Sequence, residues 1–353
     1  MPFTTEQLAY GGKAAIDFYL KNTPIDQINV AHPFLKKLIE GKKEYAGGLQ
    51  YVVEQLRYSN DSNFQSYFGD SQVSYNRKRT LQQAKYAWGS FHDGFGLNED
   101  ELIQNGISIV DDKNVTPTAA EVVSLTNLFE ENMETLKLGF QENFDIMVHR
   151  SGSQSATDIA GLDSLVSQTP SVSATIGTLN QNTYTWWRNI ASMGLAQAAL
   201  IGEMERVWRE CTRYGGKAPN FILCGGTFID IYRAAAGVTV DRQINGVGGL
   251  QKGGVSVDAG TTAVYFKGVE LVWDPVFDLL DTIEGVLTYP WAKRCYFLNM
   301  DTIRLRPIKG QWMVARKPPR VYDRYIHYWA LTCKAALTTN KRNANAVLSV
   351  TGT

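Results

Sequence analysis

The chain has 353 residues, enough for a large hydrophobic core and for two domains. Its 35 lysines and arginines balance 35 aspartates and glutamates, so the formal net charge is zero. This balance gives no global signal for binding nucleic acid or a membrane surface, and it offers little electrostatic resistance to packing against further copies of the chain. No run of about 18 apolar residues predicts a transmembrane helix.

Residues 1–47 are predicted to form an N-terminal arm with short helical patches. Its first residues, Met1–Gln7, have neither the basic nor the apolar part of a secretion signal, so we expect none. The helical patches are interrupted by Pro24, Pro33, Gly47 and Gly48. Lysine pairs at 36–37 and 42–43 are offset by Glu40 and Glu44, which is typical of a solvated face.

The next segment, residues 48–92, is predicted to be two strands joined by a long polar loop. Leu49, Tyr51 and Val53 alternate with other residues on the way out, and Tyr86, Trp88 and Phe91 mark the return. A loop of this length is usually functional or disordered. We expect it to lie on another surface, or alternatively to bind single-stranded nucleic acid. The residues that would make this contact are Phe64, Tyr67, Phe68, Tyr75, Arg77, Lys78 and Arg79.

The clearest helix is predicted over residues 116–148. Thr116 can cap it, Pro117 suits its first turn, and Thr118 with Glu121 can form a capping box. One face of this helix is a continuous apolar stripe, and its other faces are strongly acidic, with Lys137 as a single base. The apolar stripe consists of Val122, Leu125, Phe129, Met133, Leu136, Phe140, Phe144 and Met147, and the acids are Glu121, Glu130, Glu131, Glu134, Glu142 and Asp145. A coiled-coil dimer is an alternative, although the heptad is blurred.

Two adjacent tryptophans, Trp186 and Trp187, stand near the start of a second helix predicted over residues 183–213. Neighbours on a helix point about 100° apart, so both cannot enter one core stripe. We expect Trp186, Trp187 and Arg188 to anchor either two layers of one domain or two subunits.

The other predicted elements alternate irregularly between strand and helix, which favours an α+β class over a doubly wound sheet. We expect a loop over 158–182, a strand over 220–224, a helix from Thr227 to Ala236 ended by Gly237, and a glycine-rich loop over 245–262. Further strands are predicted over 263–266, 269–273, 295–305 and 325–337. The last has one face formed by His327, Trp329, Leu331, Cys333, Ala335 and Leu337.

No catalytic constellation is visible, so we do not expect an enzyme, a bound metal or a cofactor. The histidines, His32, His92, His149 and His327, are dispersed without the spacing of zinc ligands. Gly225-Gly226-Thr227 opens a helix, but it lacks the lysine and the spacing of a phosphate-binding loop. Cys211, Cys224, Cys295 and Cys333 are expected to be reduced thiols in buried or half-buried places.

Charge is distributed unevenly along the chain. From Ile303 onward there are ten basic residues against one acid, Asp323, while the helix over 116–148 is acidic. We expect complementary patches within or between copies, and alternatively that part of the basic tail faces nucleic acid.

These elements, in this order, resemble a tailed-bacteriophage major capsid protein of the Hong Kong 97 type. Local patterns similar to that family are found in residues 161–166 (GLDSLV), 185–189 (TWWRN), 266–275 (FKGVELVWDP) and 295–307 (CYFLNMDTIRLRP). The resemblance covers nearly the whole chain. It implies an N-terminal arm at 1–47, an extended loop at 48–92, a peripheral domain at 93–180 with a spine helix at 117–148, an axial domain at 181–294, and a return to the peripheral domain at 295–353.

The resemblance implies a function as well as a fold. Copies would assemble through homo-pentamers and homo-hexamers into an icosahedral or prolate head shell around double-stranded DNA, in a virion assembled in the host cytoplasm. A separate scaffolding protein is expected, because only about 47 residues precede the extended loop. A portal protein, a decoration protein and non-specific contact with DNA are further expected partners, and no membrane is. The alternatives are an encapsulin-like compartment with protein cargo and a soluble α+β enzyme.

Overall fold

The computed structural model describes residues 31–47, 49–104, 119–213, 217–241, 264–318 and 326–351. The first thirty residues of the predicted arm, the predicted cap at 116–118 and the glycine-rich loop at 245–262 lie outside the described residues. The chain divides into two compact units. One contains Ser90–Phe144 and Gly310–Lys334, and the other contains Ala31–Gly89, Asp145–Lys309 and Ala335–Thr353.

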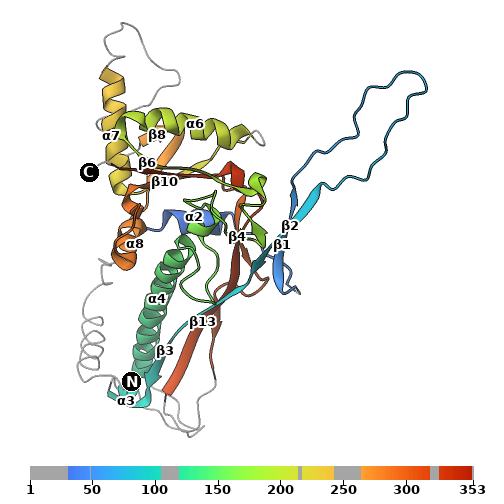
Figure 1. The fold of residues 1–353 in the computed structure, drawn as a ribbon. Coiled ribbons are helices and arrows are strands. Elements are labelled where there is room, and N and C mark those ends of the chain that lie inside the picture. The colour runs from blue at the N-terminus through green and yellow to red at the C-terminus, as the bar shows by residue number, and fades with distance from the viewer. Residues whose placement is uncertain are drawn as a thin grey trace. The chain divides into compact units, whose positions relative to one another are not determined.

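The larger unit is built on a six-stranded mixed sheet with the order β6-β14-β10-β7-β9-β8 (Figure 1). Parallel pairing joins β6 to β14 and β7 to β9, and the other neighbours are antiparallel. The strands are β6 (Ile190–Leu195), β7 (Phe221–Cys224), β8 (Val264–Phe266), β9 (Val269–Trp273), β10 (Arg294–Leu298) and β14 (Ala346–Val350). Lys267 and Gly268, both at positive φ, form the turn between β8 and β9.

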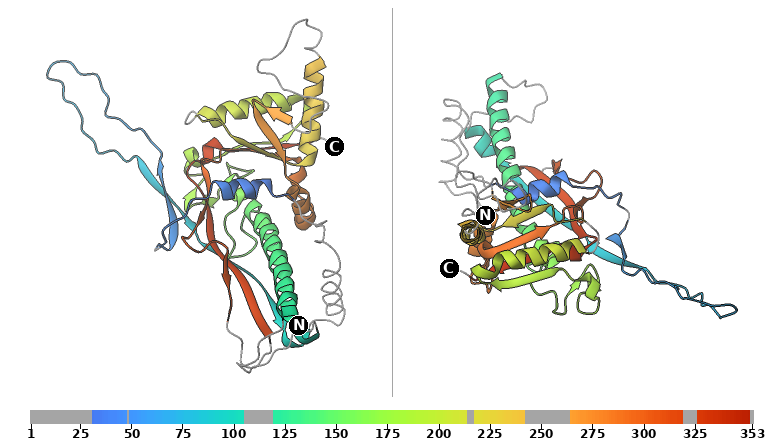
Figure 2. Two further views of the ribbon diagram at one scale, coloured as in Figure 1. Left: turned by 180° about the vertical axis from the view of Figure 1, so that it is seen from behind. Right: turned by 90° about the horizontal axis from the view of Figure 1, so that it is seen from above.

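Helices α6 (Leu200–Arg213) and α7 (Gly226–Asp241) cover one face of this sheet, as the two views in Figure 2 show. Leu200, Met204, Val207 and Cys211 recur at helical spacing on α6 and are buried in the core with Phe297 of β10. The amphipathic period of α6 therefore fixes which side of the helix meets the sheet.

Helix α8 (Val276–Glu284) contributes to an aromatic cluster that is separate from the core under α6. Phe277 lies 5.3 Å from Trp291 and 5.9 Å from Tyr296 between ring centroids, and all three side chains are fully buried. Tyr296 alternates along β10 with Cys295 and Phe297, which belong to the core described above, so β10 is buried on both faces. Trp291 lies in the short 3-10 turn η3 (Trp291–Lys293).

Helix α2 (Pro33–Glu40) belongs to the same unit and is the described end of the predicted arm. Pro33 occupies its first turn, where a missing N–H costs nothing, so this proline begins a helix rather than interrupting one. Phe34 and Leu38 are fully buried. Residues 43–45 continue as an extended segment beside β11 (Ile303–Pro307), with Tyr45 N–H donating to the Pro307 carbonyl at 2.9 Å.

The predicted extended loop begins and ends in an antiparallel hairpin of β1 (Tyr51–Arg57) and β2 (Leu81–Ala87). The buried face of β1 differs from the one that the alternation indicated. Val52 and Leu56 are buried, whereas Leu49 and Tyr51 are exposed. The error has a simple cause, since a shift of one residue moves every side chain to the opposite face.

The smaller unit contains most of helix α4 (Ala119–His149), the short helix α3 (Glu99–Gln104), and strands β3 (Gly89–Asn98) and β12 (Val314–Arg316), which both pair with β13 (Ile326–Thr339). Helix α4 confirms the predicted long helix where it is described, and Leu136, Phe140 and Phe144 of the predicted stripe are buried. Asp145, predicted on the acidic solvent face, is instead fully buried. Leu331, Cys333, Ala335 and Leu337 confirm the buried face of β13, whose last residues pair with β11 in the larger unit.

Three predicted elements are wrong. The helix over 183–213 is a 3-10 turn η1 (Thr185–Trp187), strand β6, a second 3-10 turn η2 (Gln197–Ala199) and only then α6. The single strand over 295–305 is two strands, β10 and β11, separated by a turn. Helix α7 continues past Gly237 to Asp241, so that glycine does not end it.

The remaining elements are short. They are α5 (Leu162–Leu165), β4 (Thr175–Ile176) and β5 (Leu179–Asn180) within the predicted 158–182 loop, and the 3-10 turn η4 (Arg342–Ala344). Strand β14 follows η4 and was not predicted. The mixture of helix and antiparallel and parallel strand confirms the α+β class.

Candidate assembly surface

The tip of the extended loop, residues 58–80, is almost wholly exposed. Four of the predicted contact residues have very large exposed fractions: Phe64 94%, Phe68 91%, Tyr75 89% and Tyr67 71%. Figures 1 and 2 show the tip extending beyond the end of the β1–β2 hairpin. Four aromatic side chains in water on one loop are unfavourable, and such groupings mark surfaces that another molecule covers.

The tip keeps its form through contacts between its own two sides. The side-chain amide of Asn63 donates to the Asn76 carbonyl at 3.1 Å, and the Ser74 hydroxyl donates to Gln65 Oε1 at 3.3 Å. Lys78 lies 3.5 Å from the Asp61 carboxylate. Arg77 and Arg79 are exposed.

The base of the loop is fixed to the larger unit by polar contacts. Glu54 Oε1 accepts from Arg306 Nη2 at 2.8 Å and from the Thr338 hydroxyl at 3.1 Å. The Tyr86 hydroxyl donates to the Thr339 carbonyl at 2.9 Å, and burial raises the pKa of this phenol. A fixed base and an uncovered tip suit a segment that reaches toward a partner.

The adjacent tryptophans have different environments. Trp187 is fully buried, and its indole N–H donates to the Ile176 carbonyl at 3.0 Å. Trp186 is half-buried and stacks on Tyr58, at the beginning of the loop tip, with centroids 5.4 Å apart and planes at 23°. The two rings also contact each other, with centroids 5.8 Å apart and planes at 60°, so the half-buried Trp186 lies between the buried Trp187 and Tyr58.

Arg188 does not form an ion pair in the described structure. Its Nε donates to the Gln181 carbonyl at 2.8 Å, and its Nη2 donates to the Asn182 carbonyl and side-chain oxygen at 3.1 Å. These bonds hold the segment that follows the double tryptophan against the β4–β5 hairpin.

A buried arginine lies behind this segment. Arg342 is 1% exposed, and its guanidinium donates to four neutral acceptors, the closest being the Leu165 carbonyl at 2.7 Å and Asn189 Oδ1 at 2.9 Å. The other two are Gln181 Oε1 at 3.2 Å and the Trp187 carbonyl at 3.1 Å. Burial lowers the pKa of Arg342 to about 10. Its charge is satisfied by dipoles rather than by a carboxylate.

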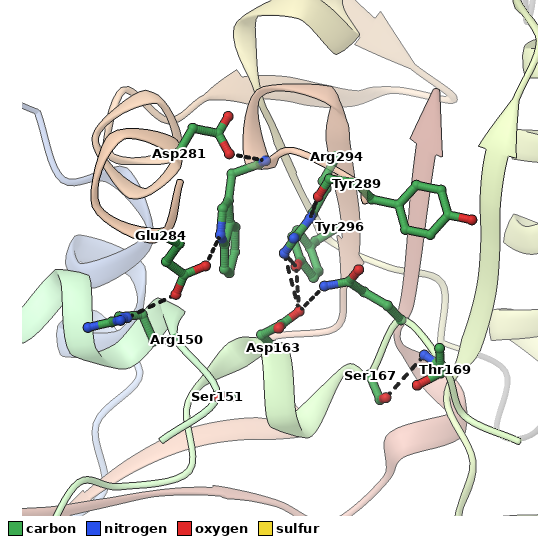
Figure 3. A network of polar contacts seen from close by, with 12 residues as sticks. Arg150, Ser151, Asp163, Ser167, Thr169, Asp281, Glu284, Tyr289, Arg294 and Tyr296 are labelled. Atoms are coloured by element: carbon green, nitrogen blue, oxygen red, sulfur yellow. Dashed lines mark hydrogen bonds and ion pairs between the residues drawn. The ribbon is translucent and has the colours of Figure 1, made fainter. Parts of the chain in front are cut away.

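A wider network supports these contacts (Figure 3). Asp163 Oδ1 accepts from Gln168 Nε2 at 2.8 Å, from the Tyr296 hydroxyl at 3.3 Å and from Arg294 at 3.4 Å. Ser167 then exchanges two hydrogen bonds with the side chain of Asn189, at 2.8 and 3.1 Å. Residues 161–167 are therefore bound to β10 through Asp163 and to the segment that follows the two tryptophans through Ser167.

In the same figure, Glu284 joins the end of α8 to two further elements. It accepts from Arg150 Nε at 2.9 Å and from the Trp291 indole at 2.8 Å, while Asp281 accepts from the Trp291 backbone N–H at 2.7 Å.

An open groove of about 940 Å³ lies at the root of the extended loop. It brings Trp186, Trp187 and Arg188 together with the start of the loop, whereas the tip residues Phe64 to Arg79 do not line it. We call it the cationic groove. Its lining consists of Leu56, Arg57, Tyr58, Ser59, Asn60, Thr185, Trp186, Trp187, Arg188, Asn189, Ile190, Glu210, Arg213, Asn340, Lys341, Arg342 and Asn343.

Sequence reasoning missed three groups in this groove. Arg57 has nothing in its local sequence that distinguishes it from an ordinary surface arginine, and Lys341 and Arg342 are two of the ten bases of the C-terminal segment without a role of their own. The aromatic tip and the double tryptophan were visible because aromatic residues in polar segments are unusual.

The described residues contain no cluster of three or more histidines, cysteines or acids that could hold a metal ion. Gly225, considered as part of an anion site, has a packing role, because a Cβ there would lie 2.3 Å from the Ala292 carbonyl oxygen. No helix in the described part of the chain is long and apolar enough to cross a bilayer.

No family model and no curated protein matches this chain. Solved structures do match it over nearly its full length. It is similar to a chain of the cyanophage A-1(L) capsid asymmetric unit, with a TM-score of 0.62 and 15% identity over 94% of this chain and 96% of that one. It is also similar to the capsid of Myoviridae phage XM1, with a TM-score of 0.54 and 12% identity over 94% and 97% of the two chains. A third match is the capsid of a native GTA particle, with a TM-score of 0.55 and 9% identity over 96% and 98%.

These matches show that the chain has the Hong Kong 97-type capsid fold, as the order of its elements indicated. At such low identity the likeness concerns the fold and leaves the activity to be argued from the surface.

Proposed function

We propose that this chain is the major capsid protein of a tailed bacteriophage, which assembles with copies of itself into the head shell. The observation that carries the proposal is the extended loop: a fixed base, a tip with four exposed aromatic side chains, and a fold shared with phage capsids. Apolar surface of this kind is stabilised when a neighbouring subunit covers it.

The proposed assembly uses one set of patches many times. Head-to-tail contacts between identical subunits close into rings, here pentamers and hexamers, and the rings tile a shell. Each contact can be modest, because every subunit makes several at once. Phe64, Tyr67, Phe68 and Tyr75 would be the buried anchors, and Arg77, Lys78 and Arg79 would meet acids on a neighbour.

The expected partners and location follow from the proposed role as a phage capsid protein. A separate scaffolding protein, a portal protein, a decoration protein and non-specific contact with packaged DNA are the expected partners, and the virion is the expected location. An encapsulin-like compartment is the second candidate. Particles filled with DNA favour the phage capsid, and particles filled with protein cargo favour the compartment.

Removal of the loop tip tests the proposal directly. Deleting residues 60–77 takes away the exposed aromatics while leaving β1 and β2 intact. We expect a protein with unchanged circular dichroism that forms no shells by electron microscopy. A matched control, Val172→Ser, changes an exposed apolar residue outside the loop and should assemble normally. Normal shells from the deletion variant would contradict the proposed role of the loop.

A further inference from the structure

The cationic groove has a surplus of positive charge. Its lining includes five cations and a single carboxylate, Glu210. That carboxylate is already engaged, because its Oε1 lies 2.9 Å from Nη1 of Arg206 on the same helix. An anionic partner entering the groove would therefore meet more positive than negative charge. The cations are Arg57, Arg188, Arg213, Lys341 and Arg342.

Two of these cations are available at the opening. Arg57 is exposed at the end of β1, and Lys341 is half-buried beside η4. Within the described residues neither makes an ion pair. Burial lowers the pKa of the Lys341 amine, the direction expected of a cation withdrawn from water without a counter-charge. Behind them, Arg342 has only neutral acceptors.

The groove also has an apolar side. The stacked pair of Tyr58 and Trp186 forms part of its wall, with the two rings facing each other. Such a wall can contact the hydrocarbon stems of long acidic side chains while the cations bind their carboxylates.

A surface of opposite charge lies on helix α4. Glu131 and Glu134 are three residues apart and so share a face, and Glu142 extends it by two turns. Glu134 is exposed and the other two are half-buried. In the described part of the chain none of the three forms an ion pair, and Lys137 is the one base among residues 131–143.

The basic end of the loop tip, by contrast, is a poor occupant. Arg77, Lys78 and Arg79 carry the same sign as the groove, and Lys78 already has Asp61 as a partner.

We propose that the cationic groove receives the acidic face of helix α4 of a second copy of the chain. The inference rests on the proposed function, since it assigns the partner surface of one contact within the shell. Arg57 and Lys341 bind the carboxylates of Glu131 and Glu134, and the Tyr58–Trp186 wall excludes water beside them. The root of the loop, as well as its tip, thus becomes part of the interface.

Reversal of charge tests the pairing. The double variants Arg57→Glu with Lys341→Glu, and Glu131→Lys with Glu134→Lys, should each remain folded by circular dichroism and lose shells in electron microscopy. The variant with all four substitutions should regain shells, because every groove then meets a helix of the new opposite sign. The control Lys334→Glu with Glu270→Lys reverses exposed charges outside both surfaces and should keep shells.

Shells from either double variant, or no recovery in the fourfold variant, would overturn the pairing. A wild-type chain that forms no shells even when it is produced together with its scaffolding protein would instead overturn the proposed function, so the two failures are distinguishable. Groove variants that keep their shells but lose binding of a fluorescent single-stranded oligonucleotide would identify a nucleic-acid site in place of the helix.

Crosslinking provides a second readout that does not depend on charge-reversed variants folding. One preparation carries Arg57→Cys and another carries Glu134→Cys, and the two are mixed before assembly and oxidised with copper phenanthroline. A dimer band on a non-reducing gel is expected, and its absence would overturn the pairing. When the second preparation carries Glu270→Cys in place of Glu134→Cys, the dimer band should be absent.

Discussion

Nε2 of His149 lies 3.1 Å from Oδ2 of Asp274, and neither side chain has any exposed surface. The other ring nitrogen, Nδ1, donates to the Asp145 backbone carbonyl at 2.8 Å and lies 3.2 Å from Asp145 Oδ1. The shorter contact takes the hydrogen bond, which leaves Oδ1 in electrostatic contact only. Asp145 also accepts from His32 at 2.9 Å, so this cluster joins α2, the end of α4 and the start of α8.

The cluster predicts how stability depends on pH. Burial by itself would lower the pKa of His149, but Asp145 and then Asp274 raise it well above its ordinary value. A raised folded-state pKa contributes stability that is complete below about 6.5, the unfolded value, and is lost as pH rises through the folded value. We expect the melting temperature to fall on the alkaline side of neutrality.

At acidic pH the dependence of stability on pH has the opposite sign. Burial alone would raise the pKa of Asp145, but His149 and then His32 hold it below its ordinary range. Its contribution is therefore present above about 4 and is lost as pH falls through the folded value.

The variant Asp274→Asn should remove much of the alkaline dependence and destabilise the fold by about 3 kcal/mol, as for a broken buried ion pair. Chemical denaturation from pH 5 to 10 measures both effects. Asp278→Asn is a matched control at an exposed carboxylate on α8, four residues further along the chain, and should change stability by less than about 0.5 kcal/mol. An unchanged pH profile in Asp274→Asn would contradict the role assigned to the cluster.

The adjacent tryptophans should differ strongly in stability. Trp187→Ala leaves a cavity and an unpaired Ile176 carbonyl, and should cost about 3–5 kcal/mol. Trp186→Ala loses a half-exposed ring and its stack on Tyr58, and should cost about 1 kcal/mol. Urea denaturation of both variants gives the comparison. Similar losses would mean that Trp186 is as much a core residue as its neighbour.

Replacement of glycine by alanine should have opposite effects on stability at Gly161 and at Gly139. A Cβ at Gly161 would lie 2.1 Å from the Arg150 carbonyl oxygen and 2.4 Å from that of Val148, so Gly161→Ala must displace backbone. A Cβ at Gly139, within α4, meets nothing within 4 Å, and Gly139→Ala should stabilise the helix by about 1 kcal/mol. Calorimetry should show a lower melting temperature for the first variant and a higher one for the second.

Arg342→Lys should be strongly destabilising although it keeps the charge. One ammonium group on a flexible stem cannot reach the four separate acceptors that the planar guanidinium satisfies. Leaving buried acceptors unpaired costs about 1–3 kcal/mol for each group. Arg188→Lys, whose partners are partly exposed, is the comparison, and equal melting temperatures for the two variants would contradict this ranking.

The sequence predicted correctly those elements that depend on interactions between residues close together in the chain. The apolar stripe of α4 needs only helical spacing, and the β8–β9 hairpin needs only Lys267-Gly268 between two apolar runs. The exposed tip was likewise predictable, because its sequence is too polar to form a core.

Elements that depend on distant partners were not predictable. Residues 190–195 contain good helix formers, yet they form β6 because β14, more than 150 residues later, pairs with them in parallel. The cationic groove was not predictable for the same reason. Arg57, Trp186 and Lys341 come from three separate segments, and no short window of sequence contains them together.

All four native cysteines are buried, and burial raises the pKa of Cys211 to about 12 and that of Cys295 well above its ordinary value. Thiol-directed dyes need an accessible thiolate, so these side chains should stay unlabelled in the native protein. A single cysteine introduced at an exposed tip position outside the aromatic set, for example Gln72→Cys, would then carry the only fluorophore in each subunit. Energy transfer between such tips could follow the loops in real time as particles form, with no background from native thiols.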